Sequence, residues 1–331
     1  MTQLLLSPHN DDEALFASFV ILRHKPFVVT CLDGRRKKDF PPPSERVEES
    51  IAAMEILGGV EYAHLWVPLA YEDWEAAVER RLRILLDFEP EHVWAPFPEP
   101  DGHGHHNGVG ELATRMWPGR VSFYSTYTQD VAGVHRSTEG EPVPIEPGWI
   151  VAKRAALGCY PSQSSRPGTA IHFDNDLDEY VVPTLRLNLG GEINRIPGFV
   201  NMDRSYGWKF EDGLGMWGDG SVEAITESHS LMYVRPEHWP LAFEEMARVL
   251  QPGGTLRITQ DAIGAPGSSR PTIRPGAHVA TSAELVLEHC ALAGLSARVV
   301  EPDETSFTDR TLIQQNYGQP PDVFHVEATK E

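Results

Sequence analysis

Cysteine, basic residues and long apolar runs are all scarce in this chain of 331 residues. The three cysteines, Cys31, Cys159 and Cys290, are odd in number and show no C-x-x-C spacing. They argue against a disulfide scaffold and predict reduced, buried thiols in a cytoplasmic protein. The longest apolar run near the start, residues 14–22, is interrupted by Ser18 and has no basic segment before it. Since a membrane span needs ~20 apolar residues, we expect neither a membrane anchor nor a targeting segment.

Positive charge is the second deficit. Lys and Arg together number 28 against 48 Asp and Glu, which gives a formal net charge of -20. A field of that sign repels phosphate backbones and anionic lipid surfaces, so we expect no nucleic-acid or membrane partner. The composition, with 41% hydrophobic and 23% charged residues, is that of a globular protein. At roughly 100–200 residues per domain, the length predicts about two domains.

The first part of the chain alternates short apolar runs with stretches of helical periodicity. The runs suit strands of a parallel sheet that is buried on both faces. The pattern also predicts a helix that begins at Ser44 and ends at Gly58, and another after Asp73. Such alternation is typical of βαβ units. We predict strands at 3–6, 27–32, 64–67, 92–97 and 121–125.

A second α/β series follows a Gly-, Pro- and Ser-rich passage before residue 170 and an acidic passage after it. We therefore place the domains at residues 1–170 and 180–331. Both are expected to be Rossmann-like, three-layer α/β/α domains with mainly parallel sheets. In the second we predict helices over 241–250 and 283–293, and strands at 184–189, 199–202, 222–226, 255–259, 297–300 and 323–328.

Two polar clusters follow predicted strands of the first domain. The run S-P-H-N-D-D-E at residues 7–13 comes after the first strand, and D-G-H-G-H-H-N at residues 101–107 comes after the fourth. Ligands of open α/β sheets bind at the carboxyl ends of the strands, so the two loops are expected to share one rim. His9, Asp12 and one histidine of the second cluster then supply the three protein ligands of a catalytic zinc.

The chemistry of such a site is amide hydrolysis. A zinc ion lowers the pKa of a bound water from 15.7 towards ~7 and polarises a carbonyl. Asp11 can then accept the proton of the water, and a nearby histidine can stabilise the oxyanion or protonate the departing amine. The alternatives are simpler: acids in a first helical turn favour its positive end, and the histidine run is a solvated loop.

The two clusters resemble the motifs of the PIG-L/LmbE-type zinc-dependent N-acetyl-amino-sugar deacetylases. The first family motif, [A/S]-H-P-D-D-E, is matched at residues 7–13, with Asn10 in place of the proline. The second, H-x-D-H, is matched at residues 103–106, with His105 where the family usually has aspartate. The resemblance covers about residues 1–168 and includes two further segments, R-x-x-E at 46–49 and K-x-x-A followed by S-Q at 153–163.

Carried over by position, the resemblance implies that one zinc ion is held by His9, Asp12 and His106. It makes Asp11 the general base and His103 the electrophilic or acid histidine.

The resemblance also implies that Arg46 contacts the substrate, although an arginine at a helix start is otherwise a common surface charge. The family's aspartate orients a neighbouring ligand, and His105 cannot supply its negative charge. The alternative is that His105 competes with His106 for the metal.

A glycine turn opens the second domain. L-N-L-G-G-E at residues 187–192 follows a predicted strand, and Asp203 ends the next one. A nucleotide-type cofactor needs glycines for close backbone approach and an acid for the ribose hydroxyls, which makes Gly190, Gly191 and Asp203 candidate cofactor-binding residues. An ordinary strand, turn and strand explains the same pattern.

The second domain resembles class I S-adenosylmethionine-dependent methyltransferases over about residues 183–300. The resemblance rests on residues 223–229 and 247–256 and on the glycine turn, where Gly191 and Glu192 stand in the C-G positions of L-N-L-G-C-G. A glutamate there crowds the site and repels the carboxylate of the cofactor. The domain is thus either an S-adenosylmethionine-dependent methyltransferase or a non-catalytic scaffold or recognition module.

For the whole chain, the leading hypothesis is a cytoplasmic zinc hydrolase that removes the acetyl group from a small N-acetylated amino sugar or glycoside. One alternative is a methyltransferase acting in the same small-molecule pathway. Another is a binding protein in which both domains are relics. Three aromatic residues among glycines, Tyr206, Trp208 and Trp217, are expected to line an exposed wall.

Overall fold

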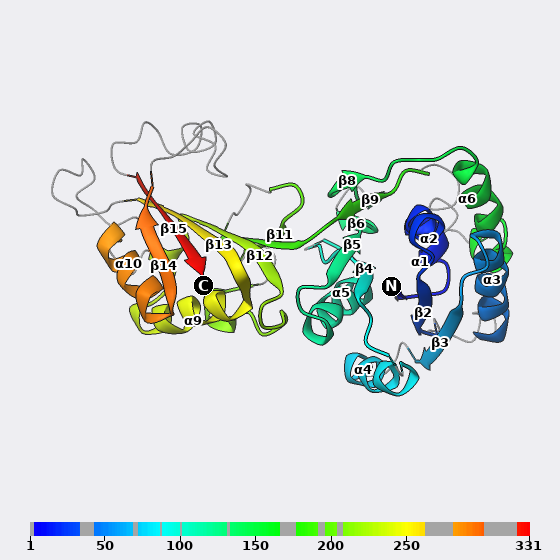
Figure 1. The fold of residues 1–331 in the computed structure, drawn as a ribbon, viewed down its shortest axis with the longest axis horizontal. Helices are drawn as coiled ribbons and strands as arrows, with labels where there is room; N and C mark the ends of the chain where they lie inside the picture. The colour runs from blue at the N-terminus through cyan, green and yellow to red at the C-terminus, as the bar shows by residue number, and fades with distance from the viewer. Residues whose placement is uncertain are drawn as a thin grey trace. The chain divides into compact units, whose positions relative to one another are not determined.

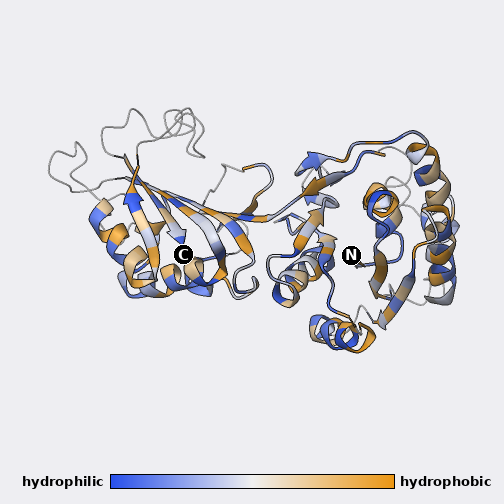
Figure 2. Cartoon of the chain, viewed as in Figure 1, coloured by the Kyte–Doolittle hydropathy of each residue, from blue (hydrophilic) through white to orange (hydrophobic). Residues whose placement is uncertain are grey.

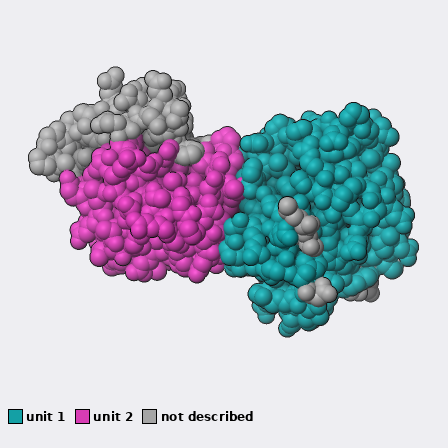
Figure 3. All heavy atoms as spheres, viewed as in Figure 1, with its two compact units in different colours: residues 1–183 teal, residues 184–331 magenta. Residues whose placement is uncertain are grey.

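The structure, a computed structural model, divides the chain into two compact units, Met1–Pro183 and Thr184–Glu331 (Figure 3). Each unit has its own main β-sheet with helices packed on it (Figure 1). The predicted fold class, two α/β domains with mainly parallel sheets, is confirmed. The residues described are 3–33, 43–68, 72–86, 88–99, 101–130, 133–165, 177–190, 196–203, 208–261, 281–300 and 323–331.

The first unit is built on a seven-stranded sheet in the order β3-β2-β1-β4-β5-β9-β8. β1 to β5 are parallel, whereas β9 runs antiparallel to both β5 and β8. The predicted apolar strands are buried: Leu4, Leu5 and Leu6 of β1 have no exposed surface. The strands are β1 (Gln3–Ser7), β2 (Phe27–Leu32), β3 (Tyr62–Val67), β4 (His92–Pro96), β5 (Val121–Tyr124), β8 (Glu141–Pro142) and β9 (Tyr180–Val182), beside a hairpin of β6 (Tyr127–Asp130) and β7 (Gly133–Arg136).

The chain reverses its direction across the sheet between β1 and β4. From β1 it moves outward to β2 and β3, and from β4 it moves the opposite way to β5. Right-handed crossovers in opposite directions put their helices on opposite faces. Accordingly, one group of helices packs on α6 and a second consists of α4 and α5. The helices are α1 (Asp12–Phe16), α2 (Ser18–His24), α3 (Pro43–Ile56), α4 (Trp74–Leu85), α5 (Gly104–Met116), α6 (Trp149–Leu157) and α7 (Pro161–Ser164).

α4 illustrates why these segments become helices on a sheet. Val78 and Leu82 lie four residues apart and are both buried, whereas Arg83 is exposed and pairs with Glu79 at 2.9 Å. Figure 2 shows hydrophobic and hydrophilic residues side by side on this helix. Such two-faced periodicity buries one stripe and leaves the other in water.

The second unit has a six-stranded sheet in the order β11-β10-β12-β13-β15-β14. β10 to β13 are parallel, and β15 runs antiparallel between β13 and β14. α9 packs on β13 and α10 on β14 and β15. The elements are β10 (Leu185–Leu189), β11 (Val200–Met202), β12 (Val222–Ser228), α9 (Trp239–Val249), β13 (Leu250–Asp261), α10 (Ala283–Leu292), β14 (Leu295–Val299) and β15 (Val323–Lys330), with short 3-10 turns at Phe210–Asp212, Leu231–Tyr233 and Pro236–His238.

The helix predicted over residues 241–250 is confirmed as α9, which ends at Val249, and β13 follows at once with the irregular pairing of its Pro-Gly-Gly stretch. One expectation for the second unit was wrong. Trp208 and Trp217 are 8% and 2% exposed, so they form no exposed wall. Their indole N–H groups find partners inside, at the carbonyl of Gly213 (2.9 Å) and the sulfur of Met202 (3.5 Å). Tyr206 lies outside the described residues.

Within the described residues, every helix is too short or too polar to pass through a lipid bilayer.

Candidate metal centre

The two polar clusters of the first unit meet at one edge of its sheet. β1 and β4 are parallel neighbours, so the loops that follow them leave the same carboxyl edge, at the point where the chain reverses direction. α1 begins at Asp12 directly after the first loop. The second cluster starts α5 rather than forming a loop: His103 is the N-cap, and His105 and His106 lie in the first turn.

His9, Asp12 and His106 converge on one point. Oδ2 of Asp12 lies 3.0 Å from Nδ1 of His9 and 3.1 Å from Nε2 of His106, and the two ring nitrogens are 3.4 Å apart. The backbone N–H of His9 donates to the same oxygen at 2.9 Å. Three ligands at ~2.1 Å around a tetrahedral ion are separated by about 3.4 Å. The donor set and its spacing therefore fit a zinc ion with little movement.

The charges of the triad suit a cation. Burial by itself would raise the pKa of Asp12, but the attraction and hydrogen bonds of His106 and His9 outweigh it and hold that pKa well below its usual range. Burial lowers the pKa of His9 to about 4 against the opposing pull of Asp12, so its ring is neutral at pH 7. Neutral imidazole and ionised carboxylate are the forms that bind metals. Nδ1 of His106 lies 3.0 Å from the hydroxyl of Thr126, which orients the ring from behind.

Asp11 lies beside the triad in a strained backbone conformation. Its φ of 117° is in the region that side chains rarely adopt, and such strain is typical of functional sites. Its carbonyl accepts the N–H groups of Ala14 and Leu15 at the start of α1. Burial raises the pKa of the Asp11 carboxyl well above its usual range, although the guanidinium of Arg46 pulls it down. Nη2 of Arg46 lies 3.6 Å from Oδ1 of Asp11.

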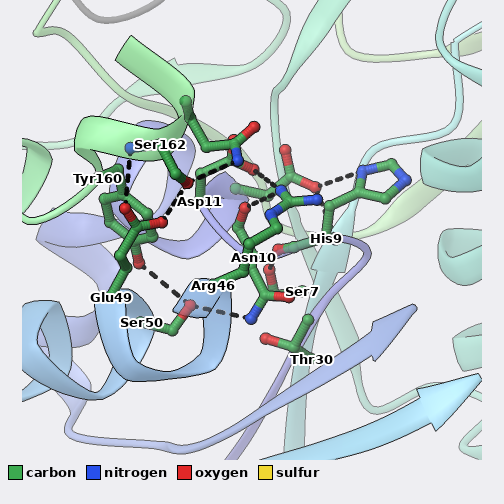
Figure 4. A network of polar contacts seen from close by, with 12 residues as sticks. Ser7, His9, Asn10, Asp11, Thr30, Arg46, Glu49, Ser50, Tyr160 and Ser162 are labelled. Carbon is green, nitrogen blue, oxygen red and sulfur yellow. Dashed lines mark hydrogen bonds and ion pairs between the residues drawn. The ribbon is translucent and has the colours of Figure 1, made fainter. Parts of the chain in front are cut away.

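Arg46 is buried, not a surface charge. It is 4% exposed, and its Nη2 donates to the carbonyl of Asn10 at 2.5 Å (Figure 4). In the described part of the chain, its Nε is buried without a hydrogen-bond partner. Arg46 thus holds the loop that carries Asp11, and its contact with a substrate stays a prediction.

Asn10 stands where the family motif has proline, and its side chain anchors the loop that carries Asp11. Its side-chain amide donates to the hydroxyls of Ser50 (3.0 Å) and Tyr62 (2.9 Å), and its Oδ1 lies 3.1 Å from Nε2 of His64. Figure 4 shows Asn10 and Ser50 joined in this network. The extra contacts replace the rigidity of a proline ring with hydrogen bonds, a role that motif comparison alone did not reveal.

Glu13 ties the same loop to the rest of the unit. Its carboxylate accepts the hydroxyls of Ser7 (2.8 Å) and Tyr160 (2.6 Å) and the backbone N–H of Asp11 (3.2 Å). Burial raises the pKa of Glu13, although these hydrogen bonds oppose the shift. Glu13 is fully buried and its carboxylate accepts three hydrogen bonds, so its role is to hold the loop in place.

The R-x-x-E and S-Q segments of the sequence also meet. Glu49 accepts the backbone N–H and the hydroxyl of Ser162 at 2.9 and 2.5 Å, which joins α3 to α7 (Figure 4). Nearby, Nζ of Lys153 donates to Glu179 at 2.8 Å, and neither side chain has exposed surface. The other carboxylate oxygen of Glu179 accepts the N–H of Phe19 in α2 at 2.8 Å. Lys153 belongs to the K-x-x-A segment, but no sequence pattern indicates that Glu179 is its partner.

His103 and His105 lie close to the triad but outside it. The N–H of His105 donates to Nδ1 of His103 at 3.3 Å, and the ring centroid of His103 is 5.2 Å from that of His106. Nδ1 of His105 lies 3.1 Å from Nε2 of His9, the nitrogen that faces away from Asp12.

In the second unit, Gly190 and Asp203 follow neighbouring parallel strands. Leu189 and Met202 are register partners, and the N–H of Gly190 donates to the carbonyl of Met202 at 2.7 Å. Gly190 has a φ of 69°, and a Cβ there would lie 2.0 Å from Oγ of Ser230, so glycine is required. Gly191 and Glu192 lie outside the described residues. S-adenosylmethionine binding at this edge stays a prediction.

Comparisons with known proteins identify both units. The sequence model of the GlcNAc-PI de-N-acetylase family, PIG-L, matches residues 4–117, which include His9, Asp12 and His106. The model of a methyltransferase domain matches residues 208–258. The first unit therefore carries a PIG-L de-N-acetylase domain, and the second carries a methyltransferase domain. No curated protein matches the chain.

Three solved structures show only loose similarity to the chain. A SAM-dependent methyltransferase from Archaeoglobus fulgidus is 12% identical, with 44% of this chain and 86% of that chain covered and a TM-score of 0.33. GalB, the 4-carboxy-2-hydroxymuconate hydratase from Pseudomonas putida KT2440, is 19% identical, with 55% and 95% covered and a TM-score of 0.36. A methyltransferase from Mesorhizobium loti is 13% identical, with 44% and 90% covered and a TM-score of 0.30. At these TM-scores neither fold nor function follows from the similarity.

Proposed function

We propose that the first unit is a zinc-dependent N-deacetylase that removes the acetyl group from an N-acetylated amino sugar or a glycoside that bears one. The observation that carries the proposal is the convergence of His9, Asp12 and His106 at 3.0 to 3.4 Å beside the buried carboxylate of Asp11. The match to a de-N-acetylase family over residues 4–117 supports the reaction class.

The simpler explanation of the acids, that they favour the start of a helix, accounts poorly for their surroundings. Asp11, Asp12 and Glu13 are 8%, 3% and 0% exposed, and α1 is only five residues long. A carboxylate whose only role is to interact with the positive end of a helix stays exposed to water. Asp12 is instead buried and contacts the imidazole rings of His9 and His106.

Each remaining residue has a defined task in this proposal. An ion held by His9, Asp12 and His106 would supply an activated water and polarise the amide carbonyl. Asp11 takes the proton of the attacking water, a role that suits a carboxylate whose pKa burial raises above its usual range. His103 stabilises the oxyanion or gives a proton to the departing amine. Arg46 keeps Asp11 in place, and we also assign it contact with the substrate.

Metal-dependent release of acetate tests the proposal. Purified full-length protein is loaded with zinc and incubated with N-acetylglucosamine and a panel of its glycosides. We expect acetate release that stops after chelation of the metal and returns when zinc is added back. The reason is that the zinc ion is the Lewis acid that polarises the carbonyl and activates the water. Release that is unaffected by chelation would contradict a metal mechanism. Absence of release from every N-acetylated sugar by a zinc-loaded protein would contradict the substrate class.

A further inference from the structure

A second group of imidazoles lies beside the triad. His9, His103 and His105 each offer a ring nitrogen, and the three nitrogens lie within 4.8 Å of one another. All three residues are half-buried, whereas Asp12 and His106 are buried. The two groups share only His9.

His9 belongs to the two groups through different nitrogens. Its Nδ1 faces Asp12 at 3.0 Å and His106 at 3.4 Å, whereas its Nε2 lies 3.1 Å from Nδ1 of His105. The two nitrogens of an imidazole ring point in different directions, so each one can bind a metal ion at a different position. This placement argues against competition between His105 and His106 for one ion.

We propose that His9, His103 and His105 form a second metal position for a divalent cation that prefers imidazole ligands, the class of Zn²⁺, Cu²⁺ and Ni²⁺. The separation of 3.1 Å between the His9 and His105 nitrogens is near the ~3.4 Å of two ligands on one tetrahedral ion. The rings of His103 and His105 have centroids 4.9 Å apart, which brings the third ligand within reach. Partial exposure leaves room for a water in the fourth place.

The second position binds more weakly than the triad. It lacks a carboxylate, and His103 must give up the 3.3 Å contact from the N–H of His105 if its Nδ1 is the ligand.

A second ion has a consequence for activity that rests on the proposed function. His103 is the histidine to which we assign proton donation, and an ion that holds it removes it from that role. Excess zinc is then expected to inhibit the deacetylase.

The stoichiometry of zinc binding, measured without substrate, tests the second position. Full-length wild type and variants are dialysed against increasing Zn²⁺, and bound metal is counted by plasma mass spectrometry. His105→Phe keeps a ring against Trp74, whose centroid is 5.3 Å from that of His105, but removes the nitrogen. His135→Phe, at an exposed position in β7, is the matched control for the loss of one histidine. We expect wild type and His135→Phe to bind one equivalent more than His105→Phe.

Two further variants keep the test decisive. His105→Gln repeats it with a polar side chain if the phenylalanine variant does not fold, and it should bind one equivalent less than wild type. His106→Ala should lose the tight ion and keep the weaker one. Equal stoichiometry in wild type and in the His105 variants would overturn the second position. The proposed function would survive that result if His106→Ala still lost one tightly bound ion.

Discussion

Replacement of Asp11 by asparagine should abolish most turnover while the protein keeps its zinc. The change Asp11→Asn preserves size and hydrogen-bonding ability but removes the carboxylate that accepts the proton of the attacking water. A positioned general base contributes about 10²- to 10⁴-fold, and we expect kcat to fall by that factor. Asp11 is outside the triad of His9, Asp12 and His106, so metal content should stay unchanged. The measurement is the rate of acetate release together with the zinc content of the same sample.

A matched control separates this effect from a general loss of charge. Asp73 precedes α4, is exposed and makes no side-chain capping bond, so Asp73→Asn should behave as wild type. If Asp11→Asn retained full activity, Asp11 would not be the base, whatever the state of the metal.

The largest expected effect on stability comes from the buried pair of Lys153 and Glu179. Lys153→Met leaves the carboxylate of Glu179 buried with only the N–H of Phe19 to compensate it among its described contacts. Removal of one partner from a buried ion pair costs about 3–5 kcal/mol, because an uncompensated charge remains in a medium of low dielectric constant. We expect a drop of this size in the free energy of unfolding of the first unit. Urea titration followed by hydrogen exchange of the strands β1 and β4 measures it.

Two comparisons make this prediction specific. Arg83→Met breaks the exposed pair with Glu79 and should change stability by about 0.5 kcal/mol or less. The double variant Lys153→Met with Glu179→Gln removes both charges and should recover much of the loss. A loss in Lys153→Met no larger than that in Arg83→Met would show that the pair does not stabilise the unit.

The parallel sheets were predictable because their strands carry a local signal. Short apolar runs such as that of β1 stand between helical stretches, and their order along the chain suffices to place the polar clusters at one rim. β8 and β9 escaped prediction, since strands of two and three residues have no periodicity to detect. Trp208 and Trp217 were assigned to the surface from their glycine neighbours, but the burial of a large aromatic side chain depends on tertiary packing.

The candidate site was predictable in composition but not in arrangement. Metal-ligand residue types at the ends of two strands indicated His9, Asp12 and a histidine of the second cluster. The role of Asn10 depends on contacts with residues 40 to 54 positions away, which no local pattern encodes. The pairing of Lys153 with Glu179 and the divergence of the two nitrogens of His9 likewise exist only in three dimensions.

The most direct test of the account is the zinc content of wild type and His106→Ala after dialysis against metal-free buffer. Folding is checked by circular dichroism, and His238→Ala in the second unit serves as the control. We predict about one tightly held zinc ion in wild type and in the control, and little in His106→Ala, because the triad loses its only buried imidazole. Equal zinc in wild type and His106→Ala, or no zinc in the wild type even after zinc is added back, would contradict the metal centre.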